Sequence, residues 1–162
     1  MSEIQIKIRQ SLSDAVATTF EEMAFEMAVP MKGDENYDEF IIEKIHAVIH
    51  IISPVEGKMA VILSSEYAKS IAENIIAQNA DEITPELVND MLGEILNTIA
   101  GNYMKNLTHS SIKFELGLPH TGEGAPQLEA DELESVTFRM NGEYMIVKIY
   151  GEGFIGLSES AE

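Results

Sequence analysis

The sequence contains no cysteine, few basic residues and no long apolar run, and each of these absences excludes a class of protein. Without cysteine, the 162-residue chain has no disulfides, no thiolate nucleophile, no iron–sulfur cluster and few ways to build a structural zinc site. Only 10 basic residues stand against 28 acidic ones, which gives a formal net charge of −18. We therefore expect no nucleic acid and no anionic membrane surface as a main partner, because both would repel most of this protein.

The length and hydropathy of the chain favour a single cytoplasmic domain. No apolar segment approaches the ~20 residues that span a bilayer, and no N-terminal stretch combines positive charge with a long apolar run. Hydrophobic residues make up 45% of the chain, which is enough for a sizeable core. No linker is long enough to divide the chain, so we expect one domain over residues 1–162. Its chemistry has to come from carboxylates, amides, hydroxyls or the four histidines.

Three segments show the apolar spacing of amphipathic helices. The first is expected to begin at Ser11 or Ser13, which can cap it, and to stop at Pro30. The third opens with Thr84 as N-cap and Pro85 at the first helical position, a typical helix start. The segments are residues 11–29, 65–79 and 84–107.

Strand-like patterns fill most of the remaining chain. Asn141-Gly142 predicts a two-residue hairpin turn between the last two strands, and a glycine-rich loop is expected over residues 121–127. The order of one helix, two strands, two helices and three strands predicts an α+β protein, an α/β sandwich with long helices packed on a largely antiparallel sheet. The expected strands are residues 46–53, 58–65, 111–118, 134–140 and 143–150.

The helix expected over residues 84–107 has a narrow polar ridge. At about 100° per residue, its apolar residues form one broad stripe, and Asp90, Glu94, Asn97 and Gly101 fall on nearly the opposite side. Neighbours on this ridge are three or four residues apart, so their Cβ atoms lie roughly 5–6 Å from one another. An interior glycine costs a helix about 1 kcal/mol relative to alanine, which indicates that another surface comes close beside Gly93 and Gly101.

The spacing of these residues does not by itself identify a site. Polar residues opposite an apolar stripe are what any surface helix shows. The pattern Glu-x-x-Asn also occurs twice in this helix, as Glu86 with Asn89 and as Glu94 with Asn97. A second feature is needed to separate a functional pair from a solvated helix face.

That feature is a resemblance to a known family. Asp90, then Glu94 after three residues, Asn97 after two and Pro119 after twenty-one resemble the signature of the CheC, CheX and FliY phosphatases of bacterial chemotaxis. The helix sequence is similar to the motif helix of CheX in particular, and the likeness covers most of the chain. The earlier Glu-x-x-Asn pair has Ser111 where the distant proline should stand, so only the second pair fits.

The resemblance implies a fold, a reaction and partners. It implies a CheC/CheX-like fold, one site per chain and a homodimer. The substrate would be the aspartyl phosphate of a phosphorylated CheY-like response regulator, and the reaction hydrolysis. No cofactor or metal would be bound by this chain, and Mg²⁺ would be bound by the regulator.

The resemblance also assigns roles to the ridge. Asn97 would orient the attacking water, and Glu94 would dock against the active-site lysine of the regulator. Asp90 either contacts the partner or only tunes the helix, whereas Gly101 would belong to the partner-binding surface. Pro119 would shape the loop that supports the helix without touching the phosphate. The carboxylate leaving group has a parent pKa near ~4 and needs no general acid, so a neutral amide can suffice.

Two alternatives belong to other classes. A CheX-shaped dimeric binding module could hold a regulator or scaffold without hydrolysing anything. His46 and His50 could share one strand face and bind metal, but no third ligand is placed, which favours partly buried structural histidines. His109 and His120 are expected at the surface.

Overall fold

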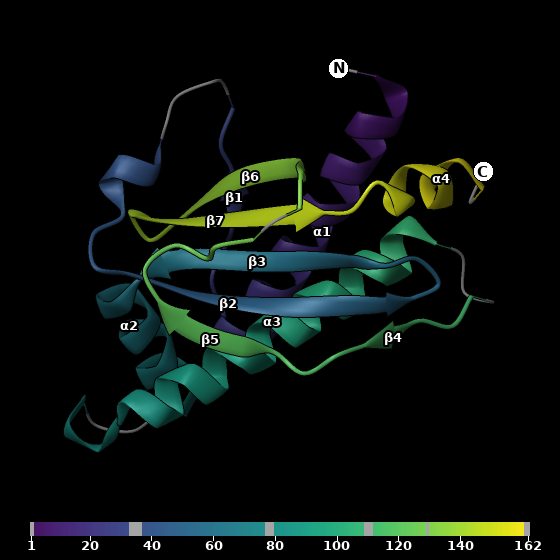
Figure 1. Ribbon diagram of the computed structural model, residues 1–162. Coiled ribbons are helices and arrows are strands. Elements are labelled where there is room, and N and C mark those ends of the chain that lie inside the picture. Colours follow the sequence, from purple (N-terminus) through teal and green to yellow (C-terminus); the bar gives the residue numbers. More distant parts are fainter. Residues whose placement is uncertain (1, 33–36, 77–79, 109–111, 129, 161–162) are drawn as a thin grey trace.

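The computed structural model describes residues 2–32, 37–76, 80–108, 112–128 and 130–160 (Figure 1). The chain forms four α-helices and seven strands over these residues. The helices are α1 (Glu3–Ala24), α2 (Ser65–Ile76), α3 (Pro85–Leu107) and α4 (Gly153–Ser160), with short 3₁₀ helices η1 (Tyr37–Phe40) and η2 (Ala80–Glu82). The strands are β1 (Val29–Pro30), β2 (Lys44–Ser53), β3 (Gly57–Ser64), β4 (Glu115–Leu116), β5 (His120–Glu123), β6 (Glu132–Met140) and β7 (Glu143–Tyr150).

Helix ends follow their capping residues, and one expected start was wrong. The Thr84 side chain accepts from the backbone N–H of Leu87 at 3.2 Å, as the predicted cap of α3 should. Helix α1 instead begins after Ser2, whose side chain accepts from the backbone N–H of Gln5, while the Gln5 side chain accepts from the backbone N–H of Ser2. This capping box starts the helix well before Ser11, which lies buried inside it.

The strands form one antiparallel sheet in the order β1-β6-β7-β3-β2-β4, and β5 also pairs with β2. Asn141 and Gly142 both have positive φ, as the predicted two-residue turn between β6 and β7 requires. The expected glycine-rich loop was placed wrongly at its start, because residues 120–123 form β5 against β2. Of the strand expected over residues 111–118, the described residues 112–118 form only the two-residue β4.

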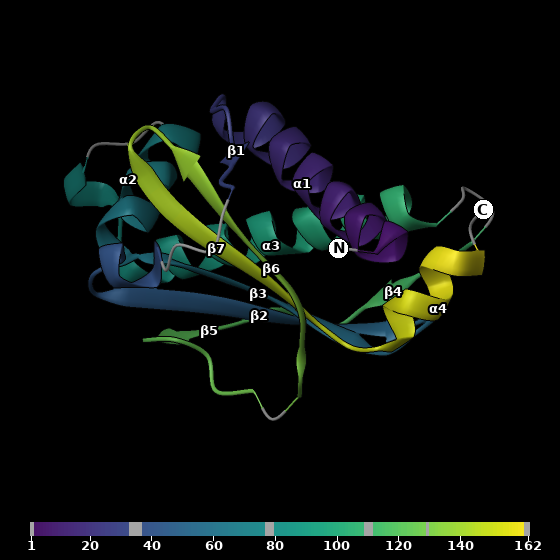
Figure 2. The ribbon, with the colours of Figure 1, turned by 90° about the horizontal axis from the view of Figure 1, so that it is seen from above.

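Helices α1, α2 and α3 lie on one face of the sheet, and the core fills the space between the two layers (Figure 2). Helices α1 and α3 run antiparallel, since Asn102 Nδ2 donates to Thr19 Oγ1 and Asn106 Nδ2 to the Ser11 carbonyl, both at 3.1 Å. The predicted α+β sandwich is therefore confirmed. Helix α1 covers one flank of α3, which leaves the other flank beside the β4–β5 edge of the sheet (Figure 1).

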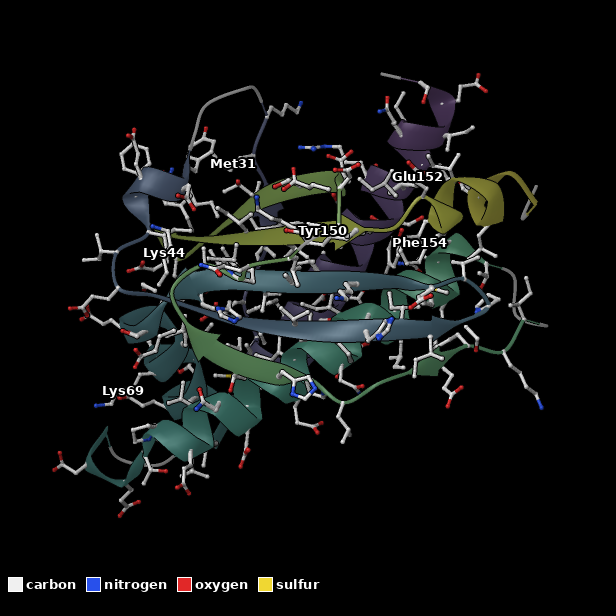
Figure 3. All side chains as sticks on the ribbon, in the orientation of Figure 1. Met31, Lys44, Lys69, Tyr150, Glu152 and Phe154 are labelled. Carbon is white, nitrogen blue, oxygen red and sulfur yellow. The ribbon has the colours of Figure 1, made fainter. Side chains whose placement is uncertain are left out.

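Helix α4 was not predicted from the sequence. Its residue Phe154, labelled in Figure 3, packs over Gly57, where any Cβ would collide with the aromatic ring. The ring also meets Tyr103 edge-on at 5.6 Å between centroids. Helix α4 therefore closes the end of the core at which β3 begins.

Candidate functional site

The polar ridge of α3 is exposed. Asp90, Glu94 and Asn97 are exposed, and Gly101 is half-buried. The opposite side of the helix enters the core, as the apolar spacing predicts. Its buried members include Val88, Met91, Leu92, Ile95, Ile99 and Tyr103.

The two residues assigned to the chemistry are available to a partner. Neither the Glu94 carboxylate nor the Asn97 amide makes a hydrogen bond or ion pair with another residue that the structure describes. The neighbouring Thr98 hydroxyl turns back onto the helix and donates to the Glu94 carbonyl at 2.8 Å. A carboxylate acceptor and an amide with both donor and acceptor atoms thus stand one turn apart and unengaged.

Gly93 makes room for Pro119. A Cβ on Gly93 would lie 3.0 Å from Cγ and 3.5 Å from Cβ of Pro119. The first distance is shorter than an ordinary carbon–carbon contact, so the proline ring packs directly on the helix backbone. The structure therefore brings Pro119 against α3 one residue before Glu94, although 25 residues lie between Gly93 and Pro119 in the sequence.

Gly101 has the opposite surroundings. A Cβ on it would meet no atom of the described residues within 4 Å. No intramolecular contact among these residues requires a glycine here, and the helix presents bare backbone toward solvent. The ridge thus ends in a shallow, open position that another molecule can approach closely.

The first Glu-x-x-Asn pair lies in different surroundings. Glu86 and Asn89 are also exposed, so exposure does not distinguish the two pairs. Asn89 lines a hollow of about 620 Å³ together with Ile83 and Val88. The ridge pair instead stands exposed on the polar side of α3, where a large partner can reach it.

Leu118 is a residue of this region that the sequence did not single out. Its side chain is 81% exposed, and it directly precedes Pro119. No local pattern marks it, because its exposure follows from how the β4–β5 segment pairs with β2.

The described histidines do not come together as a metal site. His46 Nδ1 is 2.8 Å from the Gly124 carbonyl oxygen, and His50 Nε2 is 3.1 Å from Oε1 of Glu56. His120 is exposed on β5, and His109 and Ser111 lie outside the described residues. Within the described part of the chain, no three His, Asp or Glu side chains are gathered so as to hold a metal ion.

Other features of the surface lie away from the ridge. A hollow of about 700 Å³ occupies the sheet face opposite the helices and is lined by Arg9, Tyr37, Lys148 and Tyr150, among others. None of the helices, over the residues described, has the length and apolar character needed to cross a bilayer.

Comparisons with known proteins identify the family. The family model described as "Chemotaxis phosphatase CheX" matches residues 45–141. The chain is similar in structure to the chemotaxis protein CheX from Vibrio vulnificus, with 18% identity, a TM-score of 0.72 and coverage of 93% of this chain and 100% of that chain. It is similar to a chain of the CheX–CheY–BeF3–Mg²⁺ complex from Borrelia burgdorferi, with 20% identity, a TM-score of 0.69 and coverage of 88% and 96%. It is also similar to Thermotoga maritima FliY, with 14% identity, a TM-score of 0.67 and coverage of 99% of this chain and 96% of that chain.

The fold is thus that of the CheC/CheX type, as the resemblance implied. The chain belongs to the CheX family of chemotaxis phosphatases, because the family model matches more than half of its length. A search of curated protein sequences gave no significant match.

Proposed function

We propose that this protein hydrolyses the aspartyl phosphate of a phosphorylated CheY-like response regulator. The observation that carries the proposal is the exposed, unengaged pair of Glu94 and Asn97 on α3 of a CheX-family chain. The reaction cleaves the bond between the phosphorus and the aspartyl oxygen, and water supplies the new oxygen. The products are the free carboxylate and inorganic phosphate.

Asn97 is proposed to hold the attacking water in line with the leaving oxygen. An acyl phosphate has a good leaving group, and a loose transition state requires little proton removal from the water. The amide carbonyl of Asn97 can accept a hydrogen bond from the water, while its NH₂ group can donate to a phosphoryl oxygen. A neutral side chain is also favourable at this position, because a carboxylate would repel the negatively charged phosphoryl group.

Glu94 is proposed to set the register of the complex by docking on the active-site lysine of the regulator. An exposed ion pair contributes under about 1 kcal/mol, but a pair desolvated in an interface can matter by roughly 2–5 kcal/mol when one partner is truncated. The solved complex from Borrelia burgdorferi contains CheX, CheY and Mg²⁺ together. By analogy, we assign the Mg²⁺ to the regulator, where it offsets part of the negative charge.

The remaining ridge residues are proposed to support docking. Gly101 leaves space for the partner backbone, and Asp90 either contacts the partner or only tunes the helix. Pro119 positions the edge segment against Gly93 and does not touch the phosphate. The location in the cytoplasm and the single domain over residues 1–162 remain part of the proposal.

A homodimer is also proposed, and one surface supports it. Val29 pairs in register with Arg139, and both line a hollow with Met27 at the sheet edge. Arg139 lies 6.0 Å from the centroid of the Tyr144 ring, which stacks on Tyr37 at 5.1 Å. Apolar and aromatic residues with a single arginine are typical of interface cores. Sedimentation of the wild type and of Val29→Asp tests this surface: the wild type should sediment as a dimer and the variant as a monomer. A monomeric wild type would contradict the proposed dimer.

The test of the enzymatic proposal is phosphate release from a phosphorylated receiver domain. Asn97→Ala should lower the rate by at least about a hundredfold, as removal of a single transition-state group typically does. Glu94→Ala should chiefly raise KM. Asn89→Ala is the matched control, because it removes an exposed asparagine of the same helix and should leave the rate unchanged. Equal rates for wild type and Asn97→Ala would contradict the proposal.

The alternative is a CheX-like dimeric binding module that holds a regulator or scaffold without hydrolysis. The presence of both Glu94 and Asn97 favours the enzyme. The same assay separates the two: binding of the receiver without accelerated phosphate release identifies the module.

A further inference from the structure

The edge of the sheet next to α3 contains an extra residue. Ile51 of β2 pairs with Leu116, and Val48 pairs with His120. Three steps along β2 therefore correspond to four steps along the edge, so one residue of the β4–β5 segment is in excess. Such a bulge bends a strand and changes the direction of its side chains, and bulges are frequent beside functional sites.

The segment around the bulge is fixed on both sides. The backbone N–H of Gly117 donates to the His50 carbonyl at 2.8 Å, which ties it to β2. Pro119 packs on Gly93 of α3. Leu118 lies between these two anchors and is 81% exposed. The bulge therefore holds an apolar side chain in solvent on a rigid segment, where a flexible loop could have folded it away.

This exposed leucine is linked to the ridge through the contact of Pro119 with Gly93. Leu118 precedes Pro119, Pro119 contacts Gly93, and Gly93 precedes Glu94. The carboxylates of Asp90 and Glu94 lie on the same flank of the helix, and the chain as a whole carries a net charge of −18. Long-range attraction to an acidic phosphorylated partner is thus absent, so affinity has to come from short-range contacts.

We propose that Leu118 is an apolar anchor for the phosphorylated receiver domain that the ridge serves. This inference rests on the proposed function and names a second contact of the same docking surface. The receiver would cover Leu118 with an apolar part of its surface next to the acyl phosphate, while Glu94 and Asn97 face the reacting group. An apolar centre surrounded by a polar rim is the usual anatomy of a protein–protein interface.

The test is the steady-state dephosphorylation of a CheY-type receiver charged with acetyl phosphate. Leu118→Ser should raise KM about 5- to 20-fold, the effect expected from losing much of one leucine burial, with kcat within about twofold of wild type. Leu118→Ile, which keeps an apolar side chain of the same size, should have a KM close to that of the wild type. Ile6→Ser is the control, because Ile6 is an exposed apolar residue on the N-terminal part of α1, and it should leave both constants unchanged.

The outcomes separate this inference from the proposed function. If Asn97→Ala abolishes turnover and Leu118→Ser has the KM of wild type, the anchor is wrong and the enzyme stands. If Asn97→Ala has no effect, calorimetric titration with the receiver charged with BeF3 and Mg²⁺ decides the matter. The anchor would then be overturned if the wild type and Leu118→Ser bind this receiver with equal affinity. It would also be overturned if the wild type does not bind the receiver at all.

Discussion

Gly93 of α3 and Pro119 of the β4–β5 segment are in contact, and a Cβ on the glycine would lie 3.0 Å from Cγ of the proline. This contact joins the helix that carries the polar ridge to the edge of the sheet. It also gives the two glycines of the helix different roles, because a Cβ on Gly101 would meet no described atom within 4 Å. Substitution of Gly93 and of Gly101 by alanine can therefore be compared within a single helix, one position packed against another segment and the other not.

Gly101→Ala should stabilise the protein, and Gly93→Ala should not. Alanine improves helix propensity by about 0.5–1 kcal/mol at either position. At Gly93 the new methyl group presses on Pro119, and we expect this overpacking to cancel the gain or to leave a loss of up to about 1 kcal/mol. Urea unfolding of both variants measures the difference in the free energy of unfolding. Equal stabilisation by both would contradict the tight contact.

Pro119→Ala provides the matched background for this comparison. It removes Cγ, and the next atom met by the new methyl group is Cβ at 3.5 Å, an ordinary contact. Gly93→Ala should therefore recover its stabilising effect in the Pro119→Ala background, with a coupling energy of at least about 0.5 kcal/mol. Additive effects would show that the two positions do not interact.

Glu94→Gln should raise KM for a phosphorylated receiver at least about tenfold while kcat changes little. The substitution keeps the shape of the side chain and removes its charge, and a charge pair desolvated in an interface is costly to break. Glu86→Gln is the control, since Glu86 is an exposed glutamate near the start of the same helix. If the two substitutions have the same small effect, Glu94 does not form a desolvated pair.

Raising the ionic strength should increase kcat/KM. The chain has a net charge of −18, and a receiver with an acidic phosphorylation pocket is repelled over long distances. The Debye length falls from ~30 Å at 0.01 M to ~10 Å at 0.1 M salt, so the repulsion is screened before short-range contacts are lost. Initial rates measured below KM across this range test the prediction. A rate that stays constant or falls would contradict it.

The parts of the fold that the sequence predicts correctly are those with local causes. The cap at Thr84 and the turn at Asn141-Gly142 each depend on a few adjacent residues, and both were confirmed. Serine is a typical capping residue, but Ser11 lies inside α1. Its carbonyl accepts a hydrogen bond from Asn106 on α3, which packs against α1 although it is distant in the sequence. A residue that suits a helix end does not fix that end when a better cap lies upstream.

The candidate site likewise has a part that local sequence patterns predict and a part that depends on contacts between distant segments. Helical periodicity places Asp90, Glu94 and Asn97 on one outward ridge, and the structure shows all three exposed. The contact of Pro119 with Gly93, and with it the exposure of Leu118, follows from the register of a sheet edge against β2. That register is set by partners far apart in the chain, so no local pattern could have revealed it.

Buried tyrosines give the protein a stability that should disappear at alkaline pH. Burial, followed by the hydrogen bond to Glu26 at 2.6 Å, raises the pKa of Tyr67 above its ordinary value, and burial likewise raises the pKa of Tyr103. In the unfolded chain both ionise near pH ~10, whereas the folded chain keeps both protonated. The unfolded state therefore binds fewer protons above this pH, and the free energy of unfolding should fall by up to about 1.4 kcal/mol per pH unit for each tyrosine.

Tyr67→Phe and Tyr103→Phe should each make this alkaline loss less steep, but they should differ near pH ~7. Tyr67→Phe leaves the buried Glu26 carboxylate without its donor, which should cost about 1–3 kcal/mol. The Tyr103 hydroxyl is buried and has no hydrogen-bond partner among the described residues, so Tyr103→Phe should be neutral or slightly stabilising. Urea unfolding at neutral and alkaline pH measures both effects. A wild-type slope that neither substitution reduces would show that other groups cause the alkaline loss.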